Sequence, residues 1–574
     1  MALLTPETIR ESPAPPAGRL PGAARPPRWA RVVRAGARLR PVLPLPLLAV
    51  WLLQIVASLS LRNTAFQDEA LYLYAGRDLL RAWLAGTPAG EAYAVYFSGL
   101  PYFYPVLAGA LDAAGGLELA RLLSLGCMLW TAGAVYLLAR RLLSEASALP
   151  AAALFAVQGP VLFLGRLATY DALSLALLAA GAVLAVGAGR AGRARRALPA
   201  AAGVGAVLCL AVAAKYAALL YAPAALAILG WQAWRVRGGR AAVVRGAVAA
   251  GAMVAGLAAV VAADPRVLEA LRTTTTERVA YGHATALTLA ADAAALTGAV
   301  VALGAIGLLR LNGRRRLLAV VLLGTAFLAP AYHILKAEPT SLHKHVAFGT
   351  LFAAPLAGYA LARLGGLGAA RPPGRRSLAV LAACLLTFNL GLDQARGLYA
   401  GWPESGRLER VLRTLVRPGS DRVLAEEAEV PRYYLQDLLS ARQWSQLSFY
   451  QYTDAQGRGL SGVPAYRTAL AEGHFDVVVL RYGPSQAVAD AIEPGLRDGR
   501  AYELVTTLPF ETASGRGAYW IWRKAAAPAP QPGHQLGAEP GPPAWAPDVE
   551  DEVAPPARSD AEPDASGGRS PSEA

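Results

Sequence analysis

Apolar runs of about twenty residues recur through the first 395 positions of this chain. A run of this length crosses a hydrocarbon core of roughly 30 Å as an α-helix. Only 17% of all residues are charged and 55% are hydrophobic, a balance that a soluble protein of this size would rarely have. Because lipid leaves no partner for an exposed backbone polar group, repeated spans predict a polytopic α-helical membrane protein.

Eleven spans are predicted, and they have the approximate bounds 42–60, 118–139, 147–164, 172–189, 198–214, 217–234, 242–263, 291–309, 317–333, 346–364 and 377–394. Arginines cluster in alternate short loops, as at Arg140-Arg141 and Arg314-Arg315-Arg316. Positive loops stay in the cytoplasm. We therefore expect a multi-pass protein of the plasma (inner) membrane, with its N-terminus in the cytoplasm and its C-terminal part outside.

Composition divides the chain into four predicted parts. Residues 1–41 are rich in Pro, Ala and Arg and read as a disordered, basic cytoplasmic tail, since a cleavable signal would place its apolar core closer to Met1. Residues 42–395 form the transmembrane domain. Residues 400–524 alternate strand-like and helix-like patterns, which predicts a small extracytoplasmic α/β domain. Residues 525–574 are acidic, have little to bury and are predicted to be disordered.

The predicted outer loop 61–116 has structure of its own. Residues 67–84 are predicted to form an interfacial helix, with Tyr72, Ala75, Leu79 and Trp83 on one face. A second segment, 100–111, is interrupted by proline and too short to span, so we expect it at the membrane surface. In the α/β domain, strands are predicted at 422–425, 474–481, 502–508 and 518–522, and helices at 430–439 and 486–498.

Several functions find no support in the sequence. The net charge of +15 comes from loop arginines and no nucleic-acid-binding motif accompanies it, so nucleic acid is not a predicted partner. Cys127, Cys209 and Cys384 lie inside apolar spans without ligand-like spacing and read as small core residues. Neither a Walker phosphate loop nor a zinc-protease helix motif occurs.

Three carboxylates lie beside predicted spans. Asp68 and Glu69 follow the first span, where adjacent acids are costly to keep and suggest chemistry at the membrane surface. They could also simply favour the positive N-terminal end of the helix 67–84. A carboxylate near an apolar surface makes a good general base, because desolvation raises its proton affinity. Asp171 opens the fourth span, either as a helix cap or as a site residue on the same side.

Basic residues are predicted on the side of the membrane that carries these acids. Arg166, Lys215 and Lys344 either extend along the apolar surface to the interface or bind a phosphate group. His343 and His345 are two positions apart and so point to different sides of a helix, which argues against a metal site. Hydrogen bonding to a phosphate or a sugar is the favoured interpretation of these histidines.

Four segments together resemble the C-type (GT-C) glycosyltransferase superfamily. The first is Phe66-Gln67-Asp68-Glu69-Ala70 with the following Tyr72, Ala75 and Arg77, and the later ones are 120–124, 138–142 and 164–171. Their order is similar to that in the protein O-mannosyltransferase and aminoarabinose-transferase branch. The resemblance covers roughly residues 45–395, and the region 334–345 does not align with the family pattern.

The resemblance implies an inverting membrane glycosyltransferase. It implies a polyprenyl-phosphate sugar donor in the outer leaflet, and a hydroxyl on a lipid, glycan or protein acceptor. It makes Asp68 the general base. The other expected site residues are Glu69 and Asp171 as orienting acids, Arg166, Lys215 and Lys344 at the donor phosphate, and Tyr72, Tyr170 and His343 against the substrate. No cofactor is predicted, and a divalent metal ion is compatible with this chemistry without being required.

Two other functions stay open at this point. A lipid or polysaccharide transporter or flippase should carry ionisable residues or broken helices near the bilayer midplane. The charges here are expected at span ends instead, which favours an enzyme. An inactive scaffold that presents the α/β domain would make Asp68 and Glu69 dispensable.

Overall fold

The computed structural model describes residues 45–278, 284–367, 374–448, 450–498 and 500–525. The tails predicted at 1–41 and 525–574 lie outside the described residues, except for Ala525. In the described part, nine stretches are helical, long and apolar enough to cross a membrane. They are α4 (Tyr104–Leu142), α7 (Tyr170–Arg190), α8 (Ala194–Ala214), η2 with α9 (Tyr216–Arg237), α10 (Gly239–Ala263), α12 (Ala286–Leu309), α13 to α14 (Arg314–Lys336), α15 (Leu342–Gly365) and α16 (Arg375–Tyr399).

Two shorter apolar helices occupy the remaining predicted spans. These are α2 (Leu45–Leu59) and α5 (Glu145–Ala156). The third span, predicted to be continuous over 147–164, is broken: α5 ends at Ala156, and α6 (Gly159–Leu164) follows it. At this break the backbone of Val157 lies so close to Gly391 of α16 that a side chain on Gly391 would overlap the Val157 carbonyl oxygen. The apolar pattern could not predict this contact.

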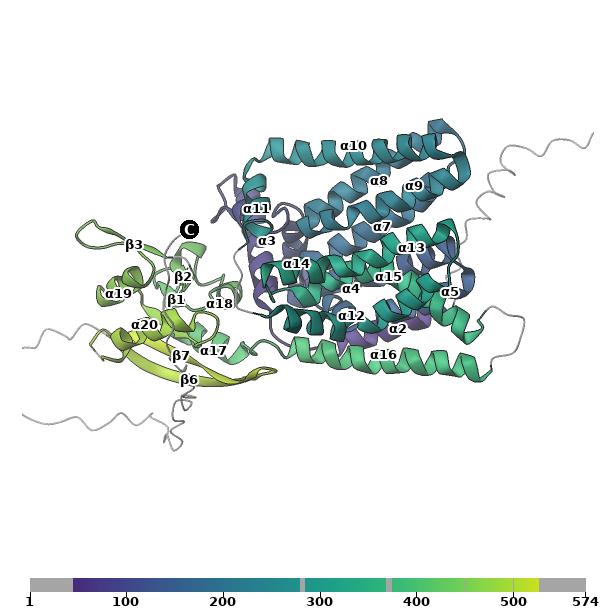
Figure 1. Cartoon of the computed structure of the whole chain (residues 1–574). Helices are drawn as coiled ribbons and strands as arrows, with labels where there is room; N and C mark the ends of the chain where they lie inside the picture. The colour runs from purple at the N-terminus through teal and green to yellow at the C-terminus, as the bar shows by residue number, and fades with distance from the viewer. Residues whose placement is uncertain (1–44, 279–283, 368–373, 449, 499, 526–574) are drawn as a thin grey trace, which may run out of the picture. The chain divides into compact units, whose positions relative to one another are not determined.

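The helices pack around α15, which is buried along almost its whole length. It contacts α12, α5 and α4, while α7 packs against α8 and α9, and α10 covers both of these (Figure 1). Helices α10 and α16 are only 11% buried over their most apolar stretches and present apolar side chains outward. This distribution is that of a bundle in lipid, since apolar surface on the outside of a soluble protein would be costly.

Helix α3 (Gln67–Ala85) forms where the interfacial helix is predicted. Tyr72, Ala75 and Leu79 are buried as expected, whereas Trp83 is 54% exposed and stacks on Tyr102. The predicted apolar face therefore ends one turn early. In α4 the dihedral angles of Gly115 and Gly116 are not helical, so the proline-containing segment before them is separate from the spanning segment after them.

Helices α3 and α4 touch through glycine. A Cβ on Gly76 would overlap the carbonyl oxygen of Pro105, and one on Gly109 would lie 2.7 Å from the carbonyl carbon of Gly76. The backbone of α3 therefore rests directly on that of α4, as small residues allow in membrane helix pairs. This contact fixes the position of α3 relative to α4. The first turn of α3 carries Asp68.

We expect Gly76→Ala to destabilise the folded protein by about 1–3 kcal/mol, because the added methyl group meets backbone that cannot move aside. Thermal unfolding of the purified protein in detergent measures the effect. Gly126→Ala is the matched control, since its Cβ would meet no atom of the described residues within 4 Å beyond its chain neighbours and the backbone of its own helix. An unchanged unfolding temperature for Gly76→Ala would contradict the close packing of α3 on α4.

The chain beyond α16 folds around a mixed five-stranded sheet of order β2-β1-β5-β7-β6. The strands are β1 (Val423–Ala425), β2 (Trp444–Gln446), β5 (Val477–Leu480), β6 (Tyr502–Thr512) and β7 (Gly515–Lys524). Strand β1 pairs in parallel with β2 and β5, and β7 pairs antiparallel with β5 and β6. A separate hairpin joins β3 (Gln451–Thr453) to β4 (Gly459–Ser461).

Four helices accompany the sheet in the described part of the chain: α17 (Gly406–Leu415), α18 (Glu429–Tyr434), α19 (Val463–Ala471) and α20 (Gln486–Arg497). Strands β1, β5, β6 and β7 and helix α20 form where they are predicted. Helix α18 ends five residues before the predicted end at 439, and α17, α19, β2, β3 and β4 were not predicted. Three of the missed elements are three-residue strands, too short for a periodic pattern.

Three consecutive residues of α18 hold the start of α3 in place. The Tyr433 hydroxyl donates to Asp112 Oδ1 at 2.7 Å, and the Tyr434 hydroxyl accepts the Ala65 N–H at 2.8 Å. Arg432 forms an ion pair with Glu91, and its guanidinium lies 4.5 Å from the Tyr74 ring centroid. The segment that leads into Asp68 is thus fixed from the sheet region as well as from the helices.

Candidate functional site

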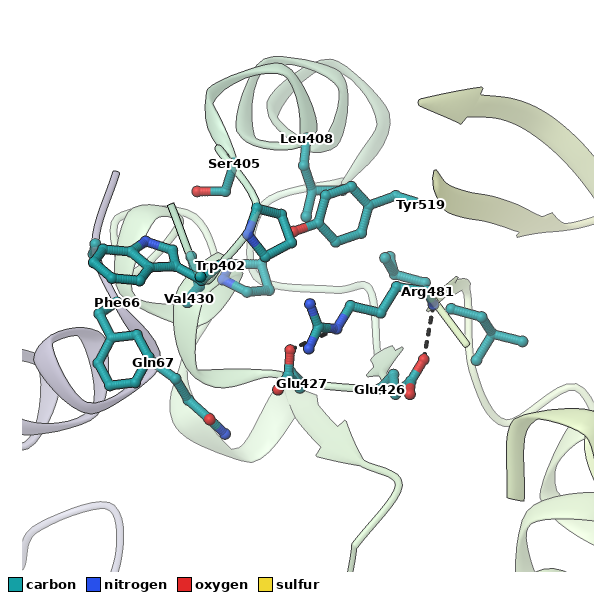
Figure 2. Close-up of a pocket in the computed structure, with 16 residues that line it drawn as sticks. Phe66, Gln67, Trp402, Ser405, Leu408, Glu426, Glu427, Val430, Arg481 and Tyr519 are labelled. Carbon is teal, nitrogen blue, oxygen red and sulfur yellow. Dashed lines mark hydrogen bonds and ion pairs between the residues drawn. The ribbon is translucent and has the colours of Figure 1, made fainter. Parts of the chain in front are cut away.

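A cavity of about 130 Å³ lies against the start of α3. Phe66, Gln67 and Trp402 line one side, and Glu427 and Arg481 lie across from them (Figure 2). The Arg481 Nε atom is 2.7 Å from Glu427 Oε2. The Phe66 ring also lies near Lys344, whose ammonium group is 5.7 Å from the ring centroid. Phe66 therefore lies between this cavity and the charged groups described below.

Glu427 is half-buried beside two other acids. Burial is the main cause that raises its pKa from the ordinary 4.5 to about 7; the Arg481 guanidinium opposes this shift, and the charges of Glu429 and Glu426 add to it. The folded protein therefore holds the Glu427 proton more tightly than the unfolded chain does. This contribution to stability is complete below about pH 4.5 and is lost as the pH rises through about 7.

We expect Glu427→Gln to remove this part of the pH dependence. Between pH 5 and pH 8 the wild type should lose more stability than the variant, because only the wild type must ionise a desolvated carboxyl group. Unfolding midpoints of both proteins at the two pH values measure the difference. Parallel pH profiles for the two proteins would contradict the raised pKa of Glu427.

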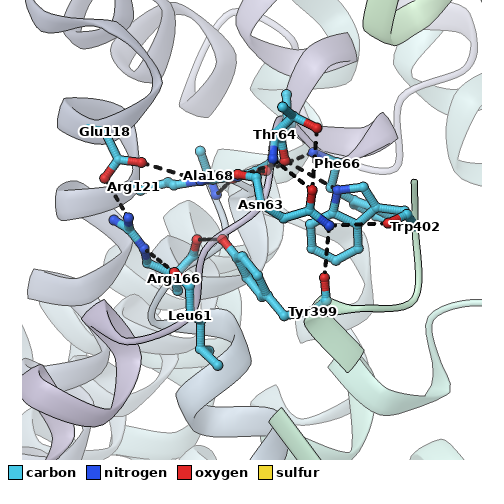
Figure 3. A network of polar contacts seen from close by, with 12 residues as sticks. Leu61, Asn63, Thr64, Phe66, Glu118, Arg121, Arg166, Ala168, Tyr399 and Trp402 are labelled. Atoms are coloured by element: carbon cyan, nitrogen blue, oxygen red, sulfur yellow. Dashed lines mark hydrogen bonds and ion pairs between the residues drawn. The ribbon is translucent and has the colours of Figure 1, made fainter. Parts of the chain in front are cut away.

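Behind this cavity, a polar network holds the loop 61–66 (Figure 3). Arg121 donates to the carbonyl oxygens of Asn63 and Thr64 at 3.0 and 3.2 Å. The Asn63 amide donates to the carbonyl oxygens of Tyr399 and Trp402. These bonds connect the loop to α4 and to the end of α16, so the position of the following residue pair is set by two distant parts of the chain.

Glu69 is part of this network and is fully buried. Its two oxygens pair with Arg121 Nε and Nη2 at 2.8 and 2.7 Å. They also accept the backbone N–H groups of Ala168 and Phe66 at 2.7 and 2.9 Å. All four contacts come from protein groups, so Glu69 positions its neighbours and has no exposed surface to offer a substrate.

Asp68 and Asp171 each pair with a lysine. Lys344, from the first turn of α15, forms an ion pair with Asp68, and the Lys215 ammonium lies 2.5 Å from Asp171 Oδ1. The side chains of Lys215, Lys344 and Asp171 are at most 4% exposed, whereas that of Asp68 is 28% exposed. Of these four charged side chains, Asp68 is the one that a dissolved group can reach.

Two tyrosines lie beside these ion pairs. The Tyr72 hydroxyl donates to that of Tyr170 at 2.6 Å, and the Tyr170 hydroxyl contacts Ser98. Burial, reinforced by the charge of Asp68, raises the pKa of Tyr72 well above 10, so its hydroxyl stays protonated. The Lys215 ammonium lies 4.9 Å from the Tyr170 ring centroid. The structure therefore gathers Asp68, Asp171, Lys215, Lys344 and the two tyrosines into one group.

Arg166 has different partners from those expected of a donor-phosphate residue. Its guanidinium donates to the Leu61 carbonyl oxygen at 3.1 Å and lies 2.5 Å from Glu118 Oε2. Its own carbonyl oxygen accepts the Tyr399 hydroxyl. In the described part of the chain, no contact joins Arg166 to Lys215 or Lys344. Arg166 therefore belongs to the polar network that holds the loop 61–66.

The histidines of this region lie in two different surroundings. His343 packs edge-on against Phe163, with ring centroids 5.2 Å apart. His345 instead contacts His333, with 2.9 Å between His345 Nδ1 and His333 Nε2. His333 Nδ1 lies 2.5 Å from the Glu338 carbonyl oxygen. No sequence pattern signals this pair, because its members are 12 residues apart on different helices.

These contacts fix the tautomers of both rings. A carbonyl oxygen can only accept, so His333 Nδ1 must carry the hydrogen and Nε2 of the neutral ring must accept. His345 Nδ1 then donates to it, which leaves His345 Nε2 with a lone pair. That atom is buried and has no hydrogen-bond partner among the described residues. It is a buried acceptor without a donor among the described residues.

We expect His345→Leu to cost about 1–3 kcal/mol of unfolding free energy, because His333 Nε2 loses its donor inside the protein. His345→Asn should cost clearly less, since its side-chain N–H₂ can replace the Nδ1 donor. Chemical unfolding of the three proteins in detergent measures the difference. Equal losses in both variants would contradict the assigned hydrogen-bond direction.

The described residues contain no group of three or more His, Cys, Asp and Glu side chains arranged to hold a metal ion. No protein-family model matches the sequence, and no curated protein matches it. Solved structures do match. ArnT from Cupriavidus metallidurans in the apo state is 14% identical, with a TM-score of 0.50 over 86% of this chain and 97% of ArnT.

Two further solved structures are similar. The oligosaccharyltransferase of Archaeoglobus fulgidus, in complex with Zn and sulfate, is 13% identical with a TM-score of 0.50, over 83% of this chain and 72% of that one. The arabinofuranosyltransferase AftD from Mycobacteria is 15% identical with a TM-score of 0.48, over 84% of this chain and 40% of AftD. At such identities similarity establishes the fold, and this multi-pass membrane chain has the fold of the GT-C glycosyltransferases.

Proposed function

We propose that this protein is a glycosyltransferase that moves a sugar from a polyprenyl-phosphate donor to a hydroxyl acceptor, with inversion, at the outer face of the plasma membrane. The observation that carries the proposal is the partly exposed Asp68 in an ion pair with the buried Lys344, beside the second pair of Asp171 and Lys215. A base next to two cations is what this transfer needs, because a proton leaves the acceptor while negative charge grows on the departing phosphate.

The two lysine–aspartate pairs suggest how charge is exchanged during transfer. The acceptor oxygen attacks the anomeric carbon, the bond from that carbon to the phosphate oxygen breaks, and the acceptor proton passes to Asp68. As phosphate gains a negative charge, Lys344 moves its interaction from Asp68 to the phosphate, with Lys215 as the second cation. Neutralisation of Asp68 and charging of the phosphate thus occur together, and the total charge of the group stays constant.

The remaining residues have supporting roles in this proposal. Glu69 and Arg121 position Asp68 by fixing the loop before it, which replaces the expected contact between Glu69 and substrate. Asp171 keeps Lys215 charged and in place. Tyr72, Tyr170 and the free nitrogen of His345 would form hydrogen bonds to the sugar. His343, packed on Phe163, would shape the wall of the site.

The acceptor would enter through the cavity at Phe66, Gln67 and Trp402. The proposal includes the predicted division into a transmembrane domain at 42–395 and an extracytoplasmic domain at 400–524. The second domain would then supply the acceptor side of the cavity through Glu427 and Arg481.

The test is a donor panel. Purified protein is incubated with polyprenyl phosphates that carry different sugars, and consumption of each lipid is followed by mass spectrometry. We expect one donor to be consumed and its polyprenyl phosphate released, with faster turnover when a hydroxyl acceptor is added. Movement of an intact donor across a proteoliposome membrane without consumption would support a transporter instead.

A further inference from the structure

A second cavity, of about 330 Å³, lies beside the loop 61–66. Its lining is almost entirely polar or charged and consists of Leu59, Arg62, Asn63, Glu118, Arg121 and Arg166. Of the residues given a role in transfer, only Arg121, which positions Asp68, is among these lining residues. Its residues come from the end of α2, the loop after it, α4 and the turn before α7, so the cavity belongs to the helical part of the chain.

The charges around this cavity do not balance. Glu118 is the one carboxylate among these lining residues, and its oxygens lie 2.5 Å from Arg166 Nη2 and 3.3 Å from Arg121 Nη1. Arg121 has Glu69 as its second partner. Arg62 is exposed and has no ion-pair or hydrogen-bond partner in the described part of the chain. Three guanidinium groups therefore face two carboxylates.

Arg166 adds an independent observation. Its side chain is 8% exposed, and its Nη1 atom is buried without any hydrogen-bond acceptor among the described residues. A buried donor left without a partner costs about 1–3 kcal/mol, and more when the group is charged. Such groups are rare in folded proteins and call for a ligand or water. A ligand with several acceptor oxygens and a negative charge would supply the acceptor that Arg166 Nη1 lacks and would balance the excess positive charge.

We propose that this cavity binds a phosphate group, held by the guanidinium groups of Arg62 and Arg166. Guanidinium forks match the oxygen spacing of phosphate and form charge-assisted hydrogen bonds with it. The phosphate could be that of a lipid headgroup or a free phosphate ion, and both offer the same oxygens. This site is separate from the Lys215 and Lys344 pairs and does not depend on the proposed transfer reaction.

A ligand here would act on the segment that carries Asp68. Arg166 donates to the Leu61 carbonyl oxygen, and Arg121 donates to those of Asn63 and Thr64. Neutralising the excess positive charge should stabilise this loop, and with it the first turn of α3. A phosphate ligand is thus expected to raise the thermal stability of the whole protein, as any ligand specific to the folded state does.

The test measures binding without any sugar donor. Delipidated, full-length protein in neutral detergent is titrated with inorganic phosphate, with chloride at matched ionic strength as the reference, and separately with phosphatidylglycerol in the micelles. Thermal unfolding reports binding. We expect a saturable rise for the wild type, and at least a fivefold weaker apparent affinity for Arg62→Gln. Arg310→Gln, which removes another exposed arginine without a side-chain partner among the described residues, should behave as the wild type.

The outcomes separate the possible ligands. A rise with inorganic phosphate shows that the phosphate group suffices, and a rise with the phospholipid alone identifies the headgroup as the source. The inference is overturned if neither ligand gives a saturable rise, or if Arg62→Gln and Arg310→Gln are affected equally. It is also overturned if Lys344→Gln, and not Arg62→Gln, abolishes phosphate binding, since the phosphate would then occupy the proposed donor site. Loss of transfer activity alone leaves it unaffected.

Discussion

Asp68→Asn should lower the rate of sugar transfer by about 100- to 10,000-fold, the usual contribution of a general base. Asparagine has nearly the same shape but cannot accept the acceptor proton. The folded state should survive, because the Asp68 side chain is 28% exposed and its one ion pair among the described residues is with Lys344. Binding of the donor should also persist, since both lysines stay in place. The effect is therefore expected in turnover rather than in donor affinity.

Consumption of the donor lipid and its equilibrium binding must be measured on the same preparation. Asp393→Asn is a suitable control, because Asp393 is exposed on α16 and has no side-chain partner in the described ranges. It should leave both quantities unchanged. Full transfer by Asp68→Asn would remove Asp68 from the role of base. A loss of transfer explained wholly by weaker donor binding would assign Asp68 to the donor instead.

Arg121→Met should destabilise the folded protein by about 3–5 kcal/mol, the largest structural effect expected in this chain. Arg121 is 1% exposed and makes two of the four contacts of the fully buried Glu69. Removing the arginine leaves a carboxylate in the interior without its counter-ion. The Asn63 carbonyl oxygen also loses its donor and that of Thr64 keeps only the Trp402 indole, so the loop that leads to Asp68 should loosen.

Chemical unfolding in detergent measures this loss, and a double variant tests its cause. Glu69→Gln combined with Arg121→Met removes the uncompensated charge, so it should recover part of the stability that Arg121→Met loses. Arg140→Met breaks an exposed pair with Glu145 and should cost less than about 1 kcal/mol. Equal losses for Arg121→Met and Arg140→Met would mean that burial of the Glu69 pair contributes nothing special.

Asp68 and Glu69 are adjacent residues with opposite properties. Asp68 is accessible and held by one ion pair, whereas Glu69 is enclosed and held by four contacts. The sequence places both acids beside the first span and predicts that both act on substrate. On a helix, neighbouring positions point about 100° apart, so one side chain of the pair faces the site and the other faces the interior. Only the packing of α3 on α4 decides that Asp68 faces the site and that Glu69 faces the interior.

The spans were predictable because lipid imposes a length and a composition on each helix. All eleven predicted spans contain an apolar helix, including the short α2 and α5. The break after Ala156 lies just before Gly159-Pro160, a pair typical of helix boundaries that the apolar pattern does not weigh, whereas the contact of Val157 with Gly391 of a distant helix could not be predicted.

The candidate site was predicted in part. Asp68, Asp171, Lys215 and Lys344 do come together as two ion pairs. Arg166 is predicted at the donor phosphate, but in the structure its side chain pairs with Glu118 and donates to the Leu61 carbonyl oxygen. The pairing of His333 with His345 was missed, because a hydrogen bond between rings on different helices leaves no pattern in the sequence.

The sequence by itself determined that this chain crosses a membrane many times and which acids and bases lie near the ends of its spans. It could do so because hydrophobic length and charge are properties of single segments. Tertiary structure alone decided which charges meet, which are enclosed and which remain open to a ligand. Those outcomes depend on contacts between segments up to several hundred residues apart, where one glycine or one buried guanidinium sets the position of a whole helix.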